Sequence, residues 1–131
     1  MVILENIPGA TPLDDLSGLI PDHITTRLEL NEWEAANILK ASQKYLLMKK
    51  RVKFSTVWLK ELHKEMFGDT WDWAGKFRKR NYNLGADWRH IQEQIKALVD
   101  DLFYWEDPQN GLRVFERSVR LHHRLVKIHP F

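Results

Sequence analysis

The chain closes with the stretch His122-His123-Arg124-Leu125-Val126-Lys127-Ile128-His129-Pro130-Phe131. A helix-like run from Leu112 to Lys127 leads into these last residues. Pro130 cannot continue that helix, and it pushes the residue before it toward an extended conformation. His129 is therefore predicted to lie where a helix passes into a loop, a common place for a reactive side chain.

The terminal helix carries two adjacent rows of largely apolar residues, which predicts that it is central and buried. The rows are Val114, Ser118, Leu121, Leu125, Ile128 and Phe115, Val119, His122, Val126, His129. One partner helix cannot cover both rows, so part of this surface is expected to stay exposed. Such a surface favours self-association, and we expect an oligomer or a marginally stable chain, with the first row as the contact.

Composition places the chain among soluble globular proteins of one domain. It has 131 residues, of which 44% are hydrophobic and 29% charged. The absence of cysteine excludes a disulfide framework and a cysteine-ligated zinc site. No apolar run is long enough to cross a bilayer and no secretion signal is present, so a cytoplasmic protein is expected.

The net charge of +2 is unevenly distributed. Residues 109–131 hold five basic residues and one acidic residue, which gives +4 for this segment. A basic terminal helix suits contact with phosphate, of a nucleotide or of nucleic acid. A solvated helix face explains the same charges equally well.

Upstream, residues 1–24 are predicted to form an irregular arm, because prolines and glycines interrupt them. Residues 25–131 are expected to form a helical domain. Asn31 and Glu34 resemble a capping box, which starts a helix running to about Lys49. Ser55 is the predicted cap of a second helix, and Gly68 is its predicted end.

Between Asp69 and Trp88 no helical stripe is present, and a short hairpin is predicted around Tyr82 to Ala86. The next helix begins near Asp87 and has the clearest apolar stripe, with members at Ile91, Ile95, Leu98, Val99, Leu102 and Phe103. Pro108 and Gly111 end it. The predicted fold class is mainly α, with four principal helices and a small hairpin.

Three stretches resemble the Fic family. Ile128-His129-Pro130-Phe131 resembles the start of its signature, HPFx[D/E]GNGRxxR. The stretch Trp71-Asp72-Trp73-Ala74-Gly75-Lys76-Phe77-Arg78 resembles the segment that leads into the β-hairpin flap of Fic proteins. Residues 9–13 and 18–27 resemble the N-terminus of a bacterial subfamily called mobile mystery protein B.

The resemblance covers nearly the whole chain and implies a Fic-like helical domain that lacks the family's C-terminal helices. It implies the N-terminal part of a protein adenylyltransferase, an enzyme that moves AMP from ATP to a Ser, Thr or Tyr hydroxyl of a target protein. In intact members, backbone amides of GNG hold phosphate and the acidic residue holds Mg²⁺. Only HPF of the signature is present here, so we expect ATP and Mg²⁺ to bind poorly and this chain to be inactive.

For individual residues, the resemblance makes His129 the general base that accepts the hydroxyl proton. A histidine that satisfies carbonyl groups at a helix end is the structural alternative. Pro130 and Phe131 anchor the motif in the family, although Phe131 is here the last residue. The flap segment Tyr82, Asn83, Leu84 and Gly85 is the candidate docking site for an extended target peptide.

Thr25 and Glu29 match the family's autoinhibitory pattern, [S/T]xxxE[G/N], except that Leu30 occupies the last position. In inhibited relatives this glutamate pairs with the second arginine of the signature and obstructs the γ-phosphate site. The plainer interpretation is an acidic residue in the first turn of a helix, where it stabilises the helix dipole. Both interpretations stay open at this point.

The residues also suggest three alternatives, which are nucleic-acid binding, a metal site and a non-catalytic interaction module. Tryptophans beside basic residues suit single-stranded nucleic acid, but core packing is the commoner reason for them, so nucleic acid is an unlikely partner. His122 and His129 lie roughly 10 Å apart by helical rise, too far to share a metal ion. A non-catalytic interaction module, such as a toxin–antitoxin component, is the alternative to an adenylyltransferase.

Overall fold

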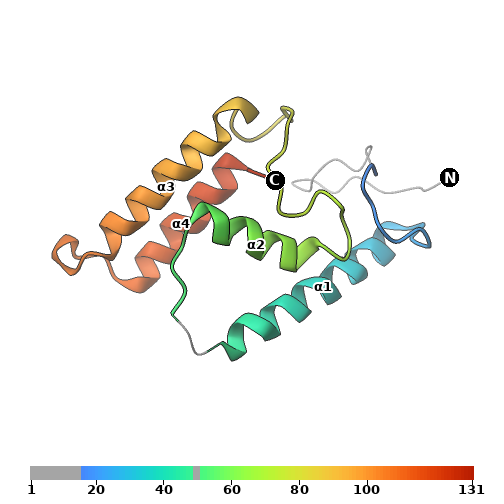
Figure 1. Cartoon of the computed structure of the whole chain (residues 1–131), viewed down its shortest axis with the longest axis horizontal. Coiled ribbons are helices and arrows are strands. Elements are labelled where there is room, and N and C mark those ends of the chain that lie inside the picture. Colours follow the sequence, from blue (N-terminus) through green and yellow to red (C-terminus); the bar gives the residue numbers. More distant parts are fainter. Residues whose placement is uncertain (1–15, 49–50) are drawn as a thin grey trace. The chain divides into compact units, whose positions relative to one another are not determined.

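The computed structural model describes residues 16–48 and 51–131. The described residues are mainly helical, as predicted, and Figure 1 shows the four main helices. These are α1 (Arg27–Leu47), α2 (Thr56–Phe67), α3 (Ile91–Glu106) and α4 (Val114–Ile128), with short 3-10 turns at Trp88–His90 and Pro108–Asn110. No helix in this part of the chain is long and apolar enough to span a membrane. The chain divides into two compact units, one of residues 1–52 and 60–75 and the other of residues 53–59 and 76–131.

In the first unit, α1 begins four residues before the predicted start. Thr26 is the N-cap, and its hydroxyl accepts a hydrogen bond from the backbone N–H of Glu29 at 3.2 Å. The Glu29 carboxylate in turn accepts the backbone N–H of Thr25 at 2.9 Å. This reciprocal pair satisfies donors that a helix start leaves open. The predicted cap at Asn31 is therefore wrong, and Lys49, the predicted end, lies outside the described residues.

The core of the first unit joins the segment before α1 to the segment after α2. Its buried residues are Ile24, Leu30 and Trp71, and Leu16, Leu19, Phe67 and Trp73 pack against them. The first fifteen residues of the predicted arm lie outside the residues that the structure describes. Within the described part of the arm, Leu19 forms an isolated antiparallel bridge with Trp71. Buried Asn37 adds polar bonds, because its side chain donates to Glu65 O and accepts from Asp69 N, both at 3.0 Å.

His63 on α2 makes the first unit sensitive to acid. Its Nδ1 accepts a hydrogen bond from the backbone N–H of Gly75 at 2.9 Å, which requires the unprotonated ring nitrogen. Burial lowers the pKa of His63 from its ordinary 6.5 to about 4. Between these values the unfolded chain binds a proton that the folded chain excludes, so folding stability falls as the pH falls.

We predict that lowering the pH from 7 to 5 costs the wild-type chain about 2 kcal/mol more stability than it costs His63→Asn. Asparagine keeps an acceptor oxygen for Gly75 N–H but has no proton to gain. Urea unfolding at the two pH values measures the difference. Equal pH dependence in the two proteins would show that His63 is not held unprotonated.

The second unit has its core between α3, α4 and the start of α2. The predicted stripe of α3 is confirmed at Ile91, Ile95, Leu98 and Leu102, which are buried, but Phe103 is exposed. The buried cluster consists of Leu59, Ile91, Ile95, Leu98 and Ile128. Helices α3 and α4 lie antiparallel and side by side (Figure 1). Asp107 and Pro108 start the turn between them, and Gly111 adopts a left-handed φ of 71°, as the breaker residues predicted.

Residues 76–87 form a loop with bends, in place of the hairpin predicted around Tyr82 to Ala86. The backbone N–H of Ala86 donates to Ile128 O at 3.1 Å, and that of Arg78 donates to Pro130 O at 3.0 Å. The side chain of Asn81 accepts the backbone N–H of Trp88 at 2.8 Å. The loop therefore forms its hydrogen bonds with the end of α4 and with its own side chains, and no second strand pairs with it.

Candidate functional site

His129 follows the last residue of α4, at the predicted change from helix to loop. Its backbone is left-handed, with φ 50° and ψ 65°, although a residue before proline is expected to be extended. Its N–H donates to Leu125 O at 2.9 Å and closes the helix. Burial and the positive charge of Arg78 both lower the pKa of His129. The ring is therefore uncharged near neutral pH and can accept a proton.

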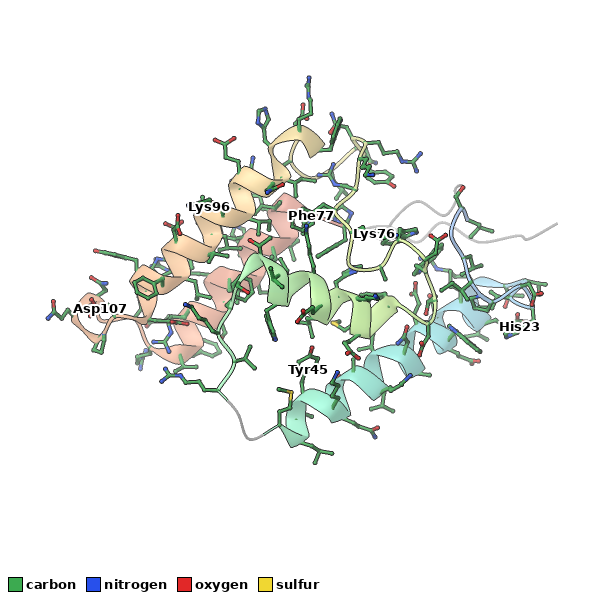
Figure 2. All side chains as sticks on the ribbon, in the orientation of Figure 1. His23, Tyr45, Lys76, Phe77, Lys96 and Asp107 are labelled. Carbon is green, nitrogen blue, oxygen red and sulfur yellow. The ribbon has the colours of Figure 1, made fainter. Side chains whose placement is uncertain are left out.

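The two residues after His129 are anchored in the second unit. Pro130 is buried, and Phe131 is partly buried against the core that includes Ile128. The Phe131 ring lies 5.3 Å from the ring of Phe77, which Figure 2 shows near the end of α4. The terminal phenylalanine thus reaches the core, a point that the sequence left open.

Arg78 is a residue of this site to which the sequence assigned no role of its own, although it ends the Trp71–Arg78 stretch that resembles the segment before the flap. The side chain is 8% exposed. Its Nε donates to His129 O at 2.6 Å, its Nη1 to Arg80 O at 2.8 Å, and its Nη2 to Ile128 O at 3.2 Å and to Ala86 O. The sequence signal that could have indicated this role is the position of Arg78 directly after Phe77, at the end of a stretch rich in aromatic residues.

The predicted flap residues lie beside His129. The ring of Tyr82 meets the ring of His129 edge-on, with centroids 6.4 Å apart and planes at 87°. The guanidinium of Arg80 lies 4.7 Å from the Tyr82 ring centroid. Asn83 and Leu84 are exposed. The segment is therefore accessible, although it is a loop and not an edge strand.

Gly85 lets this loop approach the end of α4. Its φ is 91°, and an added Cβ would lie 2.9 Å from His129 Cβ, 2.8 Å from Arg78 Nη2 and 3.1 Å from Ile128 O. An alanine at this position is strained by its backbone and crowded by its neighbours.

We predict that Gly85→Ala destabilises the chain by about 1–3 kcal/mol and moves the NMR signals of His129 and Arg78. Gly111→Ala is the matched control, because Gly111 also has a positive φ but nothing within 4 Å of an added Cβ. The control should lose stability without moving the signals of His129. Unchanged signals of His129 in Gly85→Ala would contradict the close packing.

Glu29 and Thr25 lie in the first unit, whereas His129 lies in the second. The carboxylate of Glu29 is engaged with the backbone N–H of Thr25, as described for the start of α1. This local contact is the helix-start role that the sequence offered as the plainer interpretation. The inhibitory role of Glu29 stays a prediction.

The outer face of α4 differs from the prediction. Ile128 is buried and Leu121 and Leu125 pack against the core, so this end of the first row is not exposed, whereas Val114 at the start of the row is 70% exposed. The exposed apolar residues of the second row are Phe115, Val119 and Val126. Val119, Val126 and the exposed His122 and His123 help line a shallow depression of about 470 Å³.

Two further observations concern metal-ligating side chains and the tryptophans. No group of three or more His, Cys, Asp or Glu side chains is placed to hold a metal ion in this part of the chain. Trp71 is buried in the first-unit core, and its Nε1 donates to Glu34 Oε1 at 2.9 Å. Trp73 packs against the same core. These two tryptophans therefore serve packing and not base stacking.

Comparison with known proteins agrees with this geometry. Three solved structures are similar: N-terminal Fic domains of effector proteins from Bartonella sp. AR 15-3, Bartonella sp. 1-1C and, with bound ADP, Bartonella quintana. Their TM-scores are 0.66, 0.67 and 0.67, and their identities 24%, 24% and 23%. The matches cover 83%, 83% and 90% of this chain but 58%, 60% and 65% of the solved chains. The chain therefore spans about three fifths of their length.

No curated protein matches the chain. The family model described as Fic/DOC family matches residues 53–131, which is more than half of the sequence and includes Arg78, the Tyr82–Gly85 loop and His129. The chain belongs to the Fic/DOC family.

Proposed function

We propose that this chain carries the proton acceptor of a protein adenylyltransferase, and that His129 is that acceptor. The observation that supports the proposal is the uncharged, half-buried ring at the left-handed end of α4. Burial and Arg78 both disfavour the protonated ring, so a nitrogen lone pair is available near neutral pH. The membership of residues 53–131 in the Fic/DOC family supports the same assignment.

In the proposed reaction, His129 takes the proton from a Ser, Thr or Tyr hydroxyl of a target protein. The hydroxyl oxygen bonds to the α-phosphorus of ATP while the bond from that phosphorus to the pyrophosphate oxygen breaks. AMP remains on the target, pyrophosphate leaves, and His129 releases its proton to water. A base of this kind contributes about 10²–10⁴-fold to a rate.

We assign no described side chain to the binding of phosphate or of Mg²⁺. The guanidinium next to His129, that of Arg78, is bonded to backbone carbonyls. The described residues hold no cluster of metal-ligating side chains. We therefore propose that the 131-residue chain by itself transfers no measurable AMP. The bound ADP of the Bartonella quintana domain supports nucleotide chemistry for the fold.

The proposed target contact is the Tyr82–Gly85 loop. It lies against His129 through Tyr82 and presents exposed Asn83 and Leu84. An extended peptide could bind its backbone groups without a strict sequence requirement. We propose that this contact forms in the bacterial cytoplasm.

A non-catalytic interaction module is the second candidate function, favoured by one observation. The exposed row of Phe115, Val119 and Val126 on α4 offers apolar surface to another protein or to a second copy of this chain. A module of this kind would bind a partner without any dependence on ATP.

For the test, the chain is fused to the part of the Bartonella quintana Fic domain that the match does not cover. The extended chain is mixed with a protein lysate and with ATP labelled at the α- or the γ-phosphate. AMP transfer leaves only the α-label on protein, and the chain alone should label nothing. An extended chain that unfolds cooperatively and binds ADP but labels no protein would contradict the proposal and favour the interaction module.

A further inference from the structure

Several backbone carbonyl oxygens at the end of α4 accept hydrogen bonds from one residue, Arg78. The last carbonyls of a helix have no partner within the helix. Here Ile128 O and His129 O both accept from the Arg78 guanidinium, at 3.2 and 2.6 Å. Pro130 O accepts from the Arg78 backbone N–H at 3.0 Å. Three consecutive residues are thus bonded to a single residue fifty positions earlier in the sequence.

The same guanidinium also binds the loop that faces His129. It donates to the carbonyl oxygens of Arg80 and Ala86, one at each end of the Tyr82–Gly85 segment. Arg78 therefore ties the loop and the helix end to each other. Its planar fork of five donors can serve several acceptors at fixed angles, which a lysine ammonium cannot do.

His129 needs such support, because its backbone conformation is uncommon. It is the non-glycine residue with positive φ among the described residues. A left-handed backbone is uncommon for any residue other than glycine, although histidine adopts it more often than most, and it persists where the surroundings hold it. Two hydrogen bonds enforce it here, from His129 N–H to Leu125 O and from Arg78 Nε to His129 O.

We infer that Arg78 is a positioning residue for His129: its guanidinium holds the carbonyl oxygens around the end of α4 and thereby fixes where the His129 ring stands. This inference rests on the proposed role of His129 as the proton acceptor. With the backbone fixed, the ring direction is set against the edge of Tyr82.

Arg78 also acts through its charge. The charged and titratable groups of the loop at residues 76–87, which packs against the end of α4, are Lys76, Arg78, Lys79, Arg80, Tyr82 and Asp87. Of these, Arg78 lowers the pKa of His129. The positional and electrostatic effects can be separated, because lysine keeps the charge without the fork and glutamine keeps donors without the charge.

The experiment is NMR of the full chain, with Arg78→Lys, Arg78→Gln and the exposed Arg89→Lys as matched control. Amide exchange of His129 and Ala86 should become roughly tenfold faster in both Arg78 variants and stay unchanged in the control. The pKa of the His129 ring should rise in Arg78→Gln and rise less in Arg78→Lys. A purely structural role would not separate the two variants in this way.

Unchanged exchange at His129 in both variants would overturn the inference. If the variants do not fold, the wild-type chain decides the matter. Its Arg78 guanidinium protons should be protected and show nuclear Overhauser contacts to His129 and Ala86, and rapidly exchanging protons without these contacts would overturn the inference. None of these readouts involves AMP transfer, so failure of the proposed function would leave them intact.

Discussion

Replacing His129 with alanine should lower AMP transfer by the extended chain about 10²–10⁴-fold, the contribution of a positioned general base. Affinity for ADP should stay nearly the same, because the proposed role of the ring is to accept a proton and not to bind nucleotide. The reason lies at the end of α4, where burial and Arg78 lower the pKa of the ring and so favour its uncharged form.

His122→Ala is the matched control for this measurement. His122 lies on the same helix and is exposed. Its loss should leave the transfer rate within about twofold of the starting value, since surface substitutions usually have small effects. A His129→Ala protein that folds and transfers AMP at an unchanged rate would remove His129 from the mechanism.

Leu98→Ala should destabilise the second unit by about 3 kcal/mol, within the usual range for a buried leucine. Leu98 is 0% exposed and lies between Ile95, Leu59 and Ile128 in the core cluster. The substitution removes apolar contacts and leaves a cavity. This loss is a large fraction of the 5–15 kcal/mol that is typical of a whole domain.

Urea unfolding followed by circular dichroism measures the effect of Leu98→Ala. Phe103→Ala is the control, because Phe103 is on the same helix but 74% exposed. It should change stability by about 0.5 kcal/mol or less. A cost below about 1 kcal/mol for Leu98→Ala would mean that α3 does not form the core of the second unit.

The sequence predicted elements whose signals are local. The stripe of α3 follows from the spacing of Ile91, Ile95 and Leu98, and all three are buried. The change from helix to loop at His129 follows from Pro130. The Ser55 cap is also confirmed, because its hydroxyl accepts the N–H of Trp58 at 3.1 Å.

The predictions that failed depended on competing local signals or on contacts between distant segments. Asn31 and Thr26 are both good caps, and Thr26 forms the actual cap, with its hydroxyl accepting the N–H of Glu29 while the Glu29 carboxylate accepts the N–H of Thr25. The hairpin failed because the Tyr82–Ala86 loop bonds to the end of α4, about forty residues away. The role of Arg78 could not be predicted for the same reason: its acceptors at Ile128 and His129 come together only in the fold.

The rows of α4 show a further limit of sequence patterns. Periodicity identified two apolar rows but could not say which of them faces the core. The structure buries Ile128 and packs Leu121 and Leu125 of the first row against the core, but it exposes Val114 at the start of that row as well as Val119 and Val126 of the second row. An oligomer or partner contact would therefore use the second row, not the buried end of the first.

The most direct test of the central claim is the pH titration of the His129 ring in the folded chain, followed by ¹H–¹³C NMR. The same ring in urea gives the unfolded reference. We expect the pKa of the His129 ring to be lower in the folded chain than in urea, because burial and Arg78 disfavour the charged ring. A folded-state pKa equal to or above the unfolded value would show that the end of α4 does not hold His129 ready to accept a proton.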